Sequence, residues 1–187
     1  MKLILAITGA SGTKLAIKFA NSLPASISLH LVISKSSKKA YELECQKEIN
    51  IKHKDIKIYE NEEIWASIAS SSFRADAMII LPCSMNTLAK CACGLSDNLI
   101  TRAFSCMLKE KKNIILAPRE MPFDTIALEN MLKLSKLGVY IAPPVLGYYS
   151  KQENLEDMED FLLGKWYDLL KIQNIKYKRW GDERTKL

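Results

Sequence analysis

The chain has 187 residues, of which 48% are hydrophobic and only 7 are glycine and 6 proline. This composition excludes disordered and fibrous proteins and predicts one compact globular domain. The net charge of +6 comes from 27 basic residues interleaved with 21 acidic ones, so a small phosphorylated ligand or a solvated surface accounts for it as well as a nucleic acid does. No apolar stretch approaches the roughly 20 residues that cross a bilayer, and no signal peptide is apparent. We therefore expect a cytoplasmic protein that binds neither nucleic acid nor membrane.

Short apolar runs that are typical of buried strands recur along the chain. They cover residues 3–7, 27–33, 77–81, 113–117 and 139–142. Segments with helical spacing lie at residues 11–23, 36–47, 62–71, 84–93, 98–109, 123–137 and 155–172. The alternation predicts a three-layer Rossmann-like (flavodoxin-like) α/β fold, with a mostly parallel sheet and helices on both faces. No linker divides the chain, so we expect a single domain over residues 1–187 in which residues 173–187 form a tail.

The five cysteines do not form a recognisable site. They are Cys45, Cys83, Cys91, Cys93 and Cys106. An odd number without CxxC spacing argues against a disulfide framework and against structural zinc, so we expect buried, reduced thiols and no metal.

Glycine and hydroxyl residues follow the strands where ligands bind in such folds. Gly9-Ala10-Ser11-Gly12 leads from the first strand into a helix, whose unpaired N–H groups and dipole suit a phosphate. Two glycines in such a turn are just as often needed only for the backbone. Other strand ends carry Ser34-Lys35-Ser36, the segment 82–87 and the segment 118–122. Helix capping accounts for any one of the serines, but not for their gathering at one edge of the sheet.

The first turn reads GxxG and lacks the GxGxxG of dinucleotide-binding folds. Ser34-Lys35 stands where such folds place the acid that holds a ribose diol, which favours FMN or another monophosphate over NAD. No P-loop pattern is present, so nucleoside triphosphate hydrolysis is not expected.

Arg102 and Lys109 are seven residues apart, about two helical turns, so they share a helix face that suits a phosphate. Arg119-Glu120 stands at a strand end between Pro118 and Pro122, where the arginine can grip phosphate and the carboxylate can relay a proton. A surface cluster of ion pairs is the alternative interpretation.

Together these segments resemble the UbiX-type flavin prenyltransferases over nearly the whole chain. The resemblance rests on residues 7–12, 33–35, 82–89, 97–103, 117–122, 128–132 and 179–181. It implies a metal-independent enzyme that joins reduced FMN to dimethylallyl monophosphate, first at flavin N5 and then at C6. The product, prenylated FMN, serves a UbiD-type decarboxylase, as in ubiquinone biosynthesis. A large homo-oligomer, a dodecamer in the family, is also implied, with residues 173–187 in subunit contacts.

The resemblance also implies roles for individual residues. FMN would be held by Gly9, Ala10, Ser11, Ser34, Ser84, Met85, Asn86, Thr87 and Arg119. The prenyl phosphate would be held by Arg102, Lys109, Glu120, Tyr149 and Lys165, the last at a position where some relatives carry arginine. The catalytic residues would be Ser11, Glu44, Lys109 and Glu120, with Glu44 bordering the flavin site.

The chemistry requires cations at the leaving phosphate, where negative charge develops as the allylic C–O bond breaks, and Glu120 is the candidate proton relay. The alternatives are an FMN-dependent decarboxylase of the peptidyl-cysteine or phosphopantothenoylcysteine type and a flavin-binding protein without catalysis. Those decarboxylases use a histidine early in a helix, whereas His30 falls in a strand pattern and His53 in a polar segment.

Overall fold

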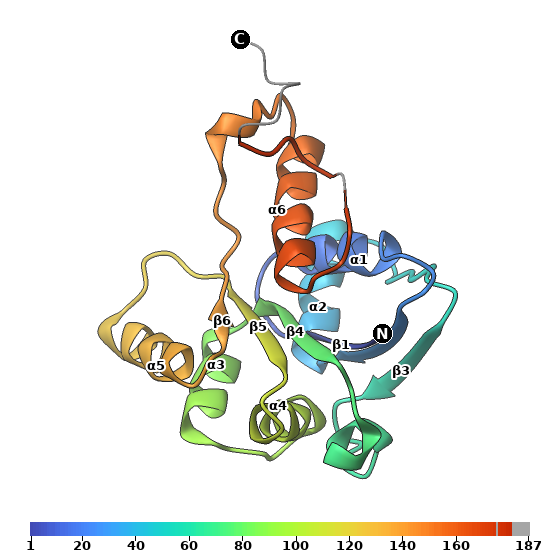
Figure 1. Ribbon diagram of the computed structural model, residues 1–187, viewed down its shortest axis with the longest axis vertical. Helices are drawn as coiled ribbons and strands as arrows, with labels where there is room; N and C mark the ends of the chain where they lie inside the picture. The colour runs from blue at the N-terminus through green and yellow to red at the C-terminus, as the bar shows by residue number, and fades with distance from the viewer. Residues whose placement is uncertain (175, 181–187) are drawn as a thin grey trace. The chain divides into compact units, whose positions relative to one another are not determined.

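The computed structural model describes residues 1–174 and 176–180 of the chain. These residues divide into two compact units, one from Met1 to Pro143 and one made of the described residues from Pro144 onward, and the first contains the whole sheet (Figure 1). Within the described ranges, none of the helices has the length and the apolar content needed to cross a membrane.

The first unit is built on a six-stranded sheet with the order β3-β2-β1-β4-β5-β6. Its strands are β1 (Lys2–Ile7), β2 (Ser28–Ile33), β3 (Ile56–Glu60), β4 (Ala77–Cys83), β5 (Asn113–Pro118) and β6 (Tyr140–Ile141). All neighbouring strands are parallel. A parallel sheet covered on both faces requires apolar side chains on both sides of its strands, which is why the central strands are unbroken hydrophobic runs. The predicted fold class is confirmed.

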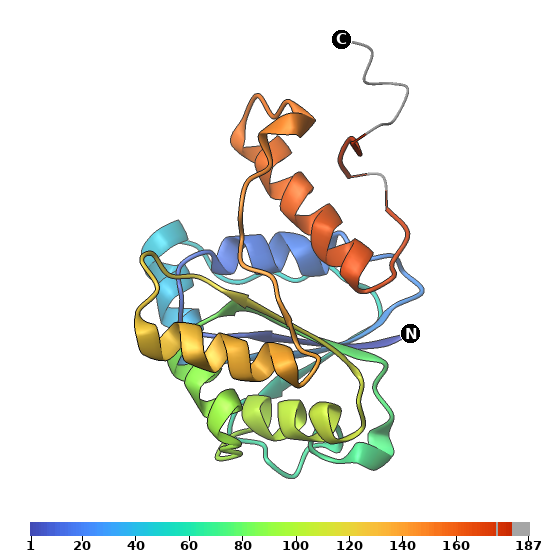
Figure 2. The same ribbon diagram turned by 60° about the vertical axis from the view of Figure 1, so that its left-hand side comes forward.

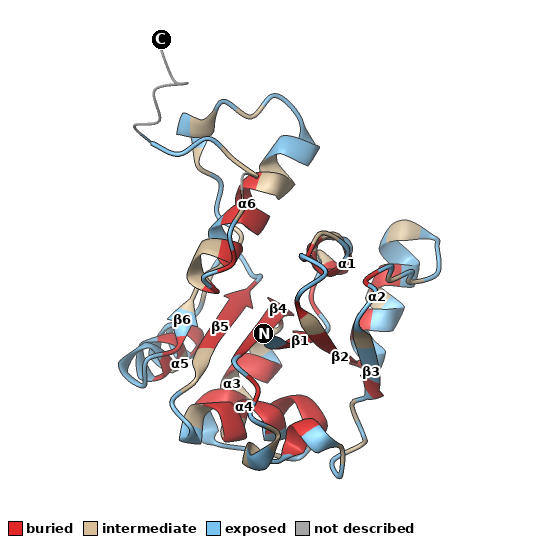
Figure 3. Ribbon diagram, turned by 45° about the vertical axis from the view of Figure 1, so that its right-hand side comes forward, coloured by how far each residue is buried: buried red, intermediate tan, exposed pale blue. Residues whose placement is uncertain are grey.

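Helices cover both faces of this sheet (Figure 2). They are α1 (Thr13–Asn21), α2 (Lys35–Cys45), α3 (Met85–Cys93), α4 (Leu99–Lys109) and α5 (Thr125–Lys136). Figure 2 shows α1 and α2 on one face and α3, α4 and α5 on the other. In α4 the buried residues Ile100, Ala103, Phe104 and Met107 follow the i, i+3, i+4, i+7 pattern of one helix face, and this apolar stripe faces the core. Figure 3 shows that the buried residues gather in the sheet and on the inner sides of these helices.

The second unit contains the helix α6 (Leu155–Leu169), preceded by a short 3₁₀ helix, η3 (Tyr148–Ser150). Asn154 caps α6 by accepting a hydrogen bond from the Asp157 N–H at 3.0 Å. Glu156 and Asp157 lie in its first turn, where negative charge is favourable beside the positive end of the helix dipole.

Two sequence predictions about the region before β4 are wrong. Strand β3 was not predicted, because it is an edge strand that leaves Ile58 55% exposed and so lacks a buried apolar run. The helix expected at residues 62–71 is replaced by two 3₁₀ helices, η1 (Ser67–Ala69) and η2 (Ser71–Phe73). Ser70 accepts a hydrogen bond from the Ser72 N–H at 3.3 Å, and such local bonds compete with a regular helix.

The expectation of buried thiols is confirmed at Cys83, Cys91 and Cys106, whereas Cys93 is exposed and Cys45 is partly exposed. Burial raises the pKa of Cys91 to about 12 and holds the pKa of Cys83 well above its usual value. These two thiols are therefore core residues and do not act as nucleophiles at neutral pH.

A buried histidine on β2 joins the sheet to its edge strand. His30 Nδ1 and the Tyr59 hydroxyl share a hydrogen bond of 2.9 Å. The rings of His30 and Phe73 pack edge to face, with their centroids 4.6 Å apart. Burial lowers the pKa of His30, and the positive charges of Lys2 and Lys57 lower it further.

The stability of the protein is expected to fall as the pH drops below about 6.5, the ordinary pKa of histidine. In this range the unfolded chain binds a proton at His30 that the folded chain excludes, so acid favours unfolding until the folded-state pKa is passed. Urea unfolding between pH 8 and 5 would measure the effect. The slope of the free energy of unfolding against pH should be smaller in the His30→Gln variant, whatever the stability of that variant at pH 8. His53→Gln is the matched control, and an unchanged slope in His30→Gln would exclude this histidine as the cause.

Candidate functional site at the carboxyl ends of the strands

The ends of β1 and β4 are joined by one buried hydroxyl. Thr8 Oγ1 donates to the Pro82 carbonyl oxygen at 2.8 Å and accepts from the Ser84 N–H at 2.8 Å. Through this threonine, the turn after β1 and the turn after β4 are fixed side by side. Thr8 lies in a segment that the sequence singled out, but no role was predicted for it.

The neighbouring strands bring two more predicted site residues to the same edge. The Ser34 N–H donates to the Ile7 carbonyl at 3.0 Å, and the Arg119 N–H donates to the Cys83 carbonyl at 3.2 Å. Since β2, β1, β4 and β5 are adjacent in that order, the residues that follow them lie along one edge of the sheet. Ser34, Ser84 and Arg119 are therefore gathered around the Gly9–Gly12 turn, as the pattern of strand ends predicts.

The glycine turn itself has two distinct backbone requirements. Gly12 has a φ of +97°, a left-handed conformation that favours glycine. Gly9 is needed for space, because a Cβ there would lie 2.5 Å from Ser36 Oγ. Ser11 is exposed in this turn, and the Gly12 N–H donates to Glu44 Oε2 at 3.2 Å, so the structure brings Glu44 to the turn. The sequence indicates only a capping role for Ser36 and does not predict that this residue limits the space at Gly9.

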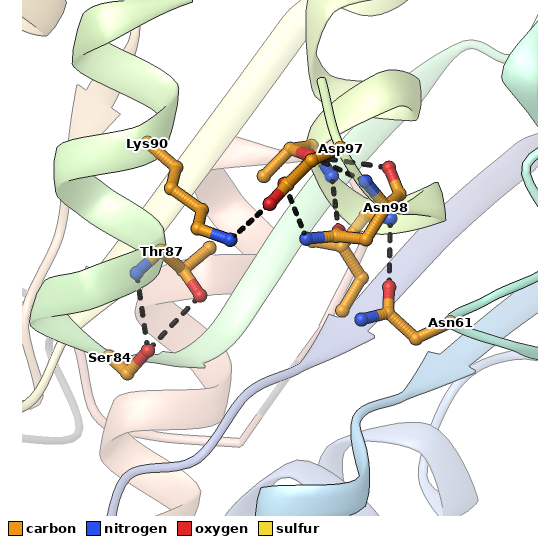
Figure 4. Close-up of polar contacts among 8 residues, drawn as sticks. Asn61, Ser84, Thr87, Lys90, Asp97 and Asn98 are labelled. Atoms are coloured by element: carbon orange, nitrogen blue, oxygen red, sulfur yellow. Dashed lines mark hydrogen bonds and ion pairs between the residues drawn. The ribbon is translucent and has the colours of Figure 1, made fainter. Parts of the chain in front are cut away.

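The serine residues after β2 and β4 cap the helices that follow them. Ser34 Oγ accepts from the Ser37 N–H at 3.2 Å, and Ser84 Oγ accepts from the Thr87 N–H at 3.3 Å (Figure 4). The Ser84 hydroxyl also donates to Thr87 Oγ1 at 3.0 Å. Capping thus explains why each serine is there, and it leaves their hydroxyl groups at the edge that gathers the other predicted residues. Ala10 is buried, Met85 is half-buried and Asn86 is exposed.

The start of α4 is fixed by a residue that the sequence analysis missed. Asn61, just after β3, accepts from the Leu99 N–H with its carbonyl at 2.8 Å and from the Ile100 N–H with Oδ1 at 3.1 Å. Asn98 Oδ1 accepts from the Thr101 N–H at 3.1 Å, and Thr101 Oγ1 accepts from the Asn98 N–H at 3.4 Å. The position of Asn61 directly after β3 is the only signal for this role, and the sequence did not reveal it because β3 was not predicted.

A second set of contacts supports the same turn. Asp97 forms an ion pair with Lys90 and accepts a hydrogen bond from the Asn98 side chain at 3.0 Å (Figure 4). The hydrogen bond from Lys90 lowers the pKa of Asp97. Arg102 follows one turn later on α4 and is exposed, so its backbone is held while its guanidinium faces solvent in this chain.

Lys109 lies at the other end of the same helix. It is four residues before Asn113, where β5 begins, and so it lies near the edge at which the parallel strands start. The six residues of β5 span roughly 17–20 Å, which separates Lys109 from Arg119 and Glu120 at the end of that strand. Within one chain, the structure therefore does not bring Lys109 together with Glu120, although the family resemblance implies that both hold one phosphate.

Arg119 and Glu120 are both exposed directly after β5. Glu120 Oε1 accepts from the Met121 N–H at 3.1 Å, a local contact that orients the carboxylate. Among the described residues, no three histidine, cysteine, aspartate or glutamate side chains are placed to hold a metal ion.

Tyr149 and Lys165 belong to the second unit. Tyr148 is 84% exposed and Tyr149 is 37% exposed, because the ring of Tyr149 packs edge-on against Phe161 and Trp180, each with centroids 5.7 Å apart. Of the predicted tail, residues 175 and 181–187 lie outside the described residues, and so does residue 181 of the segment 179–181. Residues 176–180 contact α6 of their own chain, and their predicted role in subunit contacts stays a prediction.

Comparison with known proteins gives a consistent result. Residues 1–169 match the family described as Flavoprotein. A protein of Helicobacter pylori named flavin prenyltransferase UbiX is 46% identical to this chain, and the match covers 97% of this chain and 99% of that protein.

Two solved structures are also similar over nearly the whole chain. The crystal structure of a dodecameric FMN-dependent UbiX-like decarboxylase from Escherichia coli O157:H7 is 36% identical, with a TM-score of 0.89, covering 97% of this chain and 100% of that one. AnUbiX (PadA1), solved in complex with FMN and dimethylallyl pyrophosphate, is 33% identical, with a TM-score of 0.87 and 97% of each chain covered. The chain belongs to the flavoprotein family and, within it, to the UbiX-type flavin prenyltransferases.

Proposed function

We propose that this protein transfers a dimethylallyl group from dimethylallyl monophosphate to reduced FMN, without a metal ion, and releases prenylated FMN. The similarity to AnUbiX carries this proposal, since that protein was solved with FMN and dimethylallyl pyrophosphate and aligns with 97% of this chain. The product is a modified cofactor, so FMN is a substrate here.

The residues at the strand ends fit a flavin mononucleotide. Helices α1, α2 and α3 all begin at this edge, and their amino-terminal ends favour a phosphate group. Thr13 Oγ1, directly after the glycine turn, is buried and has no hydrogen-bond partner, which marks a polar group that a ligand can satisfy. Arg119 adds a guanidinium suited to a phosphate or a carbonyl-rich ring. We assign FMN to the turn at Gly9–Gly12, Ser34, the segment from Ser84 to Thr87, and Arg119.

The leaving phosphate requires cations because negative charge develops on it as the allylic C–O bond breaks. Arg102, Lys109 and Lys165 supply that charge, and the Tyr149 hydroxyl supplies a neutral donor. Since Lys109 lies near the opposite edge of the sheet from Glu120 in one chain, we assign Lys109 to a site completed by a neighbouring subunit. The dodecameric state of the Escherichia coli structure supports such an assembly.

The remaining roles concern protons and position. Glu120 would take the proton that flavin C6 loses when the new ring closes there, or pass it to the departing phosphate. Ser11 lies in the turn at the flavin, and Glu44 holds that turn through the Gly12 N–H. Glu44 therefore acts on the site through the backbone of the turn.

Mass spectrometry of the flavin tests the activity directly. Under anaerobic conditions, wild-type protein with reduced FMN and dimethylallyl monophosphate should yield a flavin that carries one added dimethylallyl group, together with inorganic phosphate. A sample without dimethylallyl monophosphate is the control. Recovery of both substrates unchanged would contradict the proposal.

The second candidate is an FMN-dependent decarboxylase that acts on its own substrate, a name used for the Escherichia coli structure. Such an enzyme would release carbon dioxide from an acid with FMN alone. Both histidines of the chain are accounted for elsewhere, since His30 lies in β2 and His53 Nε2 bonds to the Ile27 carbonyl at 2.7 Å. Without a histidine early in a helix, the structure favours prenyl transfer.

We further propose that the product passes to a UbiD-type decarboxylase, that the protein acts in the cytoplasm, and that it assembles into a large homo-oligomer. The open edge strand β3 and exposed apolar residues such as Ile64 and Trp65 support association with other chains.

A further inference from the structure

Two carboxylates of α6 hold the described part of the carboxyl-terminal tail: Asp160 forms one ion pair of 3.5 Å with Lys176, and Asp168 makes most of the contacts. Asp168 accepts two hydrogen bonds from the Arg179 guanidinium, one at each oxygen, at 2.7 and 2.8 Å. It also accepts one from the Tyr177 hydroxyl at 2.6 Å and one from the Asn174 side chain at 2.9 Å. We call Asp168 and these three partners the Asp168 clamp.

The partners of Asp168 in the clamp stabilise its charged form. Burial alone would raise the pKa of Asp168, but the hydrogen bonds from Arg179, Tyr177 and Asn174 outweigh it and hold that pKa below its ordinary value. Burial and the bond to Asp168 raise the pKa of Tyr177 to about 12. A bidentate arginine–carboxylate pair also fixes the orientation of both groups, so the clamp sets where the tail lies as well as whether it is bound.

The surface of α6 is shaped to receive the tail. A Cβ at Gly164 would lie 2.3 Å from Tyr177 Cδ1 and 3.1 Å from Asn174 Oδ1. The absence of a side chain at this position, in the middle of a helix where glycine is unfavourable, allows the tyrosine ring to lie on the helix. The Tyr177 ring then packs edge-on against Phe161, with centroids 5.2 Å apart.

The tail held in this way contacts both residues that this unit contributes to the proposed prenyl phosphate site. Trp180 packs against the ring of Tyr149, and Lys165 Nζ lies 6.0 Å from the centroid of the Tyr177 ring. Tyr149 is thus fixed between Phe161 on the helix and Trp180 on the tail. Arg179, the neighbour of Trp180 in the chain, donates two hydrogen bonds to Asp168.

We propose that Asp168 is a positioning residue for prenyl transfer, which orients Tyr149 and Lys165 for the phosphate by clamping the tail onto α6. Asp168 touches neither substrate. The inference rests on the proposed function, because it takes Tyr149 and Lys165 as phosphate ligands.

Two variants release the tail by different means. Asp168→Asn removes the charge that pairs with Arg179, and Gly164→Ala displaces Tyr177 by contact while favouring the helix itself. Lys178→Gln is the matched control, since it removes a tail cation that is exposed and outside the clamp. Full-length oligomeric protein is used throughout.

The first measurement needs no substrate. Chymotrypsin cleavage after Tyr177 should become about tenfold faster in both variants, because a released tail is cleaved without prior opening. In Asp168→Asn the ultraviolet titration should also show one tyrosine whose pKa falls from about 12 toward the ordinary value near 10. Cleavage at the wild-type rate in both variants would overturn the clamp.

The second measurement is kinetic. Both variants should raise the KM for dimethylallyl monophosphate by about tenfold, equivalent to about 1.4 kcal/mol, with kcat at saturation and the Kd for FMN close to wild type. Lys178→Gln should change none of these. A released tail with an unchanged KM would overturn the positioning role. A wild-type protein that does not prenylate FMN would instead contradict the proposed function, and the cleavage result would still decide whether the clamp holds the tail.

Discussion

Replacing Glu120 by glutamine is expected to slow prenyl transfer by about a hundredfold while FMN remains bound. Glutamine keeps the size and the acceptor oxygen of the side chain, so the contact with the Met121 N–H is retained. It cannot exchange a proton, and general acid–base catalysis contributes on the order of 10² to 10⁴ in rate. Single-turnover reactions under anaerobic conditions would measure the rate, and flavin fluorescence would measure the Kd for FMN.

Arg119→Ala is the matched control because it alters the neighbouring residue at the same strand end. This variant should weaken FMN binding by about tenfold or more, since it removes a charged hydrogen-bond donor. Equal loss of flavin in Glu120→Gln and Arg119→Ala would contradict the separation of roles. A wild-type rate in Glu120→Gln would assign proton transfer to the departing phosphate, whose second pKa near 6 makes it a competent base.

Mixed oligomers of two inactive variants are expected to regain about a quarter of the wild-type activity. Lys109→Ala removes a phosphate cation and Glu120→Gln removes the proton relay, so each pure oligomer should be slowed by about a hundredfold. If each site takes Lys109 from one subunit and Glu120 from another, random mixing leaves about one site in four with both residues intact. Co-expression with two affinity tags would yield the mixed oligomer for assay.

The control mixes Glu120→Gln with Arg119→Ala, two residues adjacent in one chain at the end of β5. These two should not complement each other, because Arg119 and Glu120 reach a site from the same strand. If the mixture of Lys109→Ala with Glu120→Gln is no more active than the separate variants, a site shared between subunits is contradicted. The expected gain in activity depends on β5, a parallel strand that begins near Lys109 and ends just before Glu120's neighbour Arg119, and so separates Lys109 from Glu120 within a chain.

The sheet and the gathering of its strand ends could be predicted because each depends on local patterns. Unbroken apolar runs mark β1, β4 and β5, and parallel strands necessarily place their ends together. Strand β3 was not predicted because its edge position exposes Ile58, so its sequence lacks the unbroken apolar run on which the prediction relied. Local propensity likewise favoured a helix at residues 62–71, whereas bonds between serine side chains and the backbone decide the outcome there.

The site was predictable only as far as sequence neighbours determine it. A common helix face for Arg102 and Lys109 follows from their spacing, but the sheet edge at which each lies depends on the direction of the whole helix. The contact between Glu44 and the Gly12 N–H joins residues 32 positions apart, and no periodicity reveals such a pair. The pairing of Asp168 with Arg179 likewise depends on how the tail returns to α6.

The capping of α4 has a consequence for how substrate preference can change in this family. Asn61 and Asn98 with Thr101 occupy the N–H groups from Asn98 to Thr101, so the backbone at this helix start has no donor left for an anion. At the proposed phosphate site on α4, affinity would then depend on the Arg102 side chain, which one nucleotide change can replace. At α1, the cap Gly12 offers no side chain, and the turn requires glycine at Gly9 and Gly12. The proposed phosphate site at α4 can therefore change by one side-chain substitution, whereas the proposed flavin site at α1 depends on two glycines of its backbone.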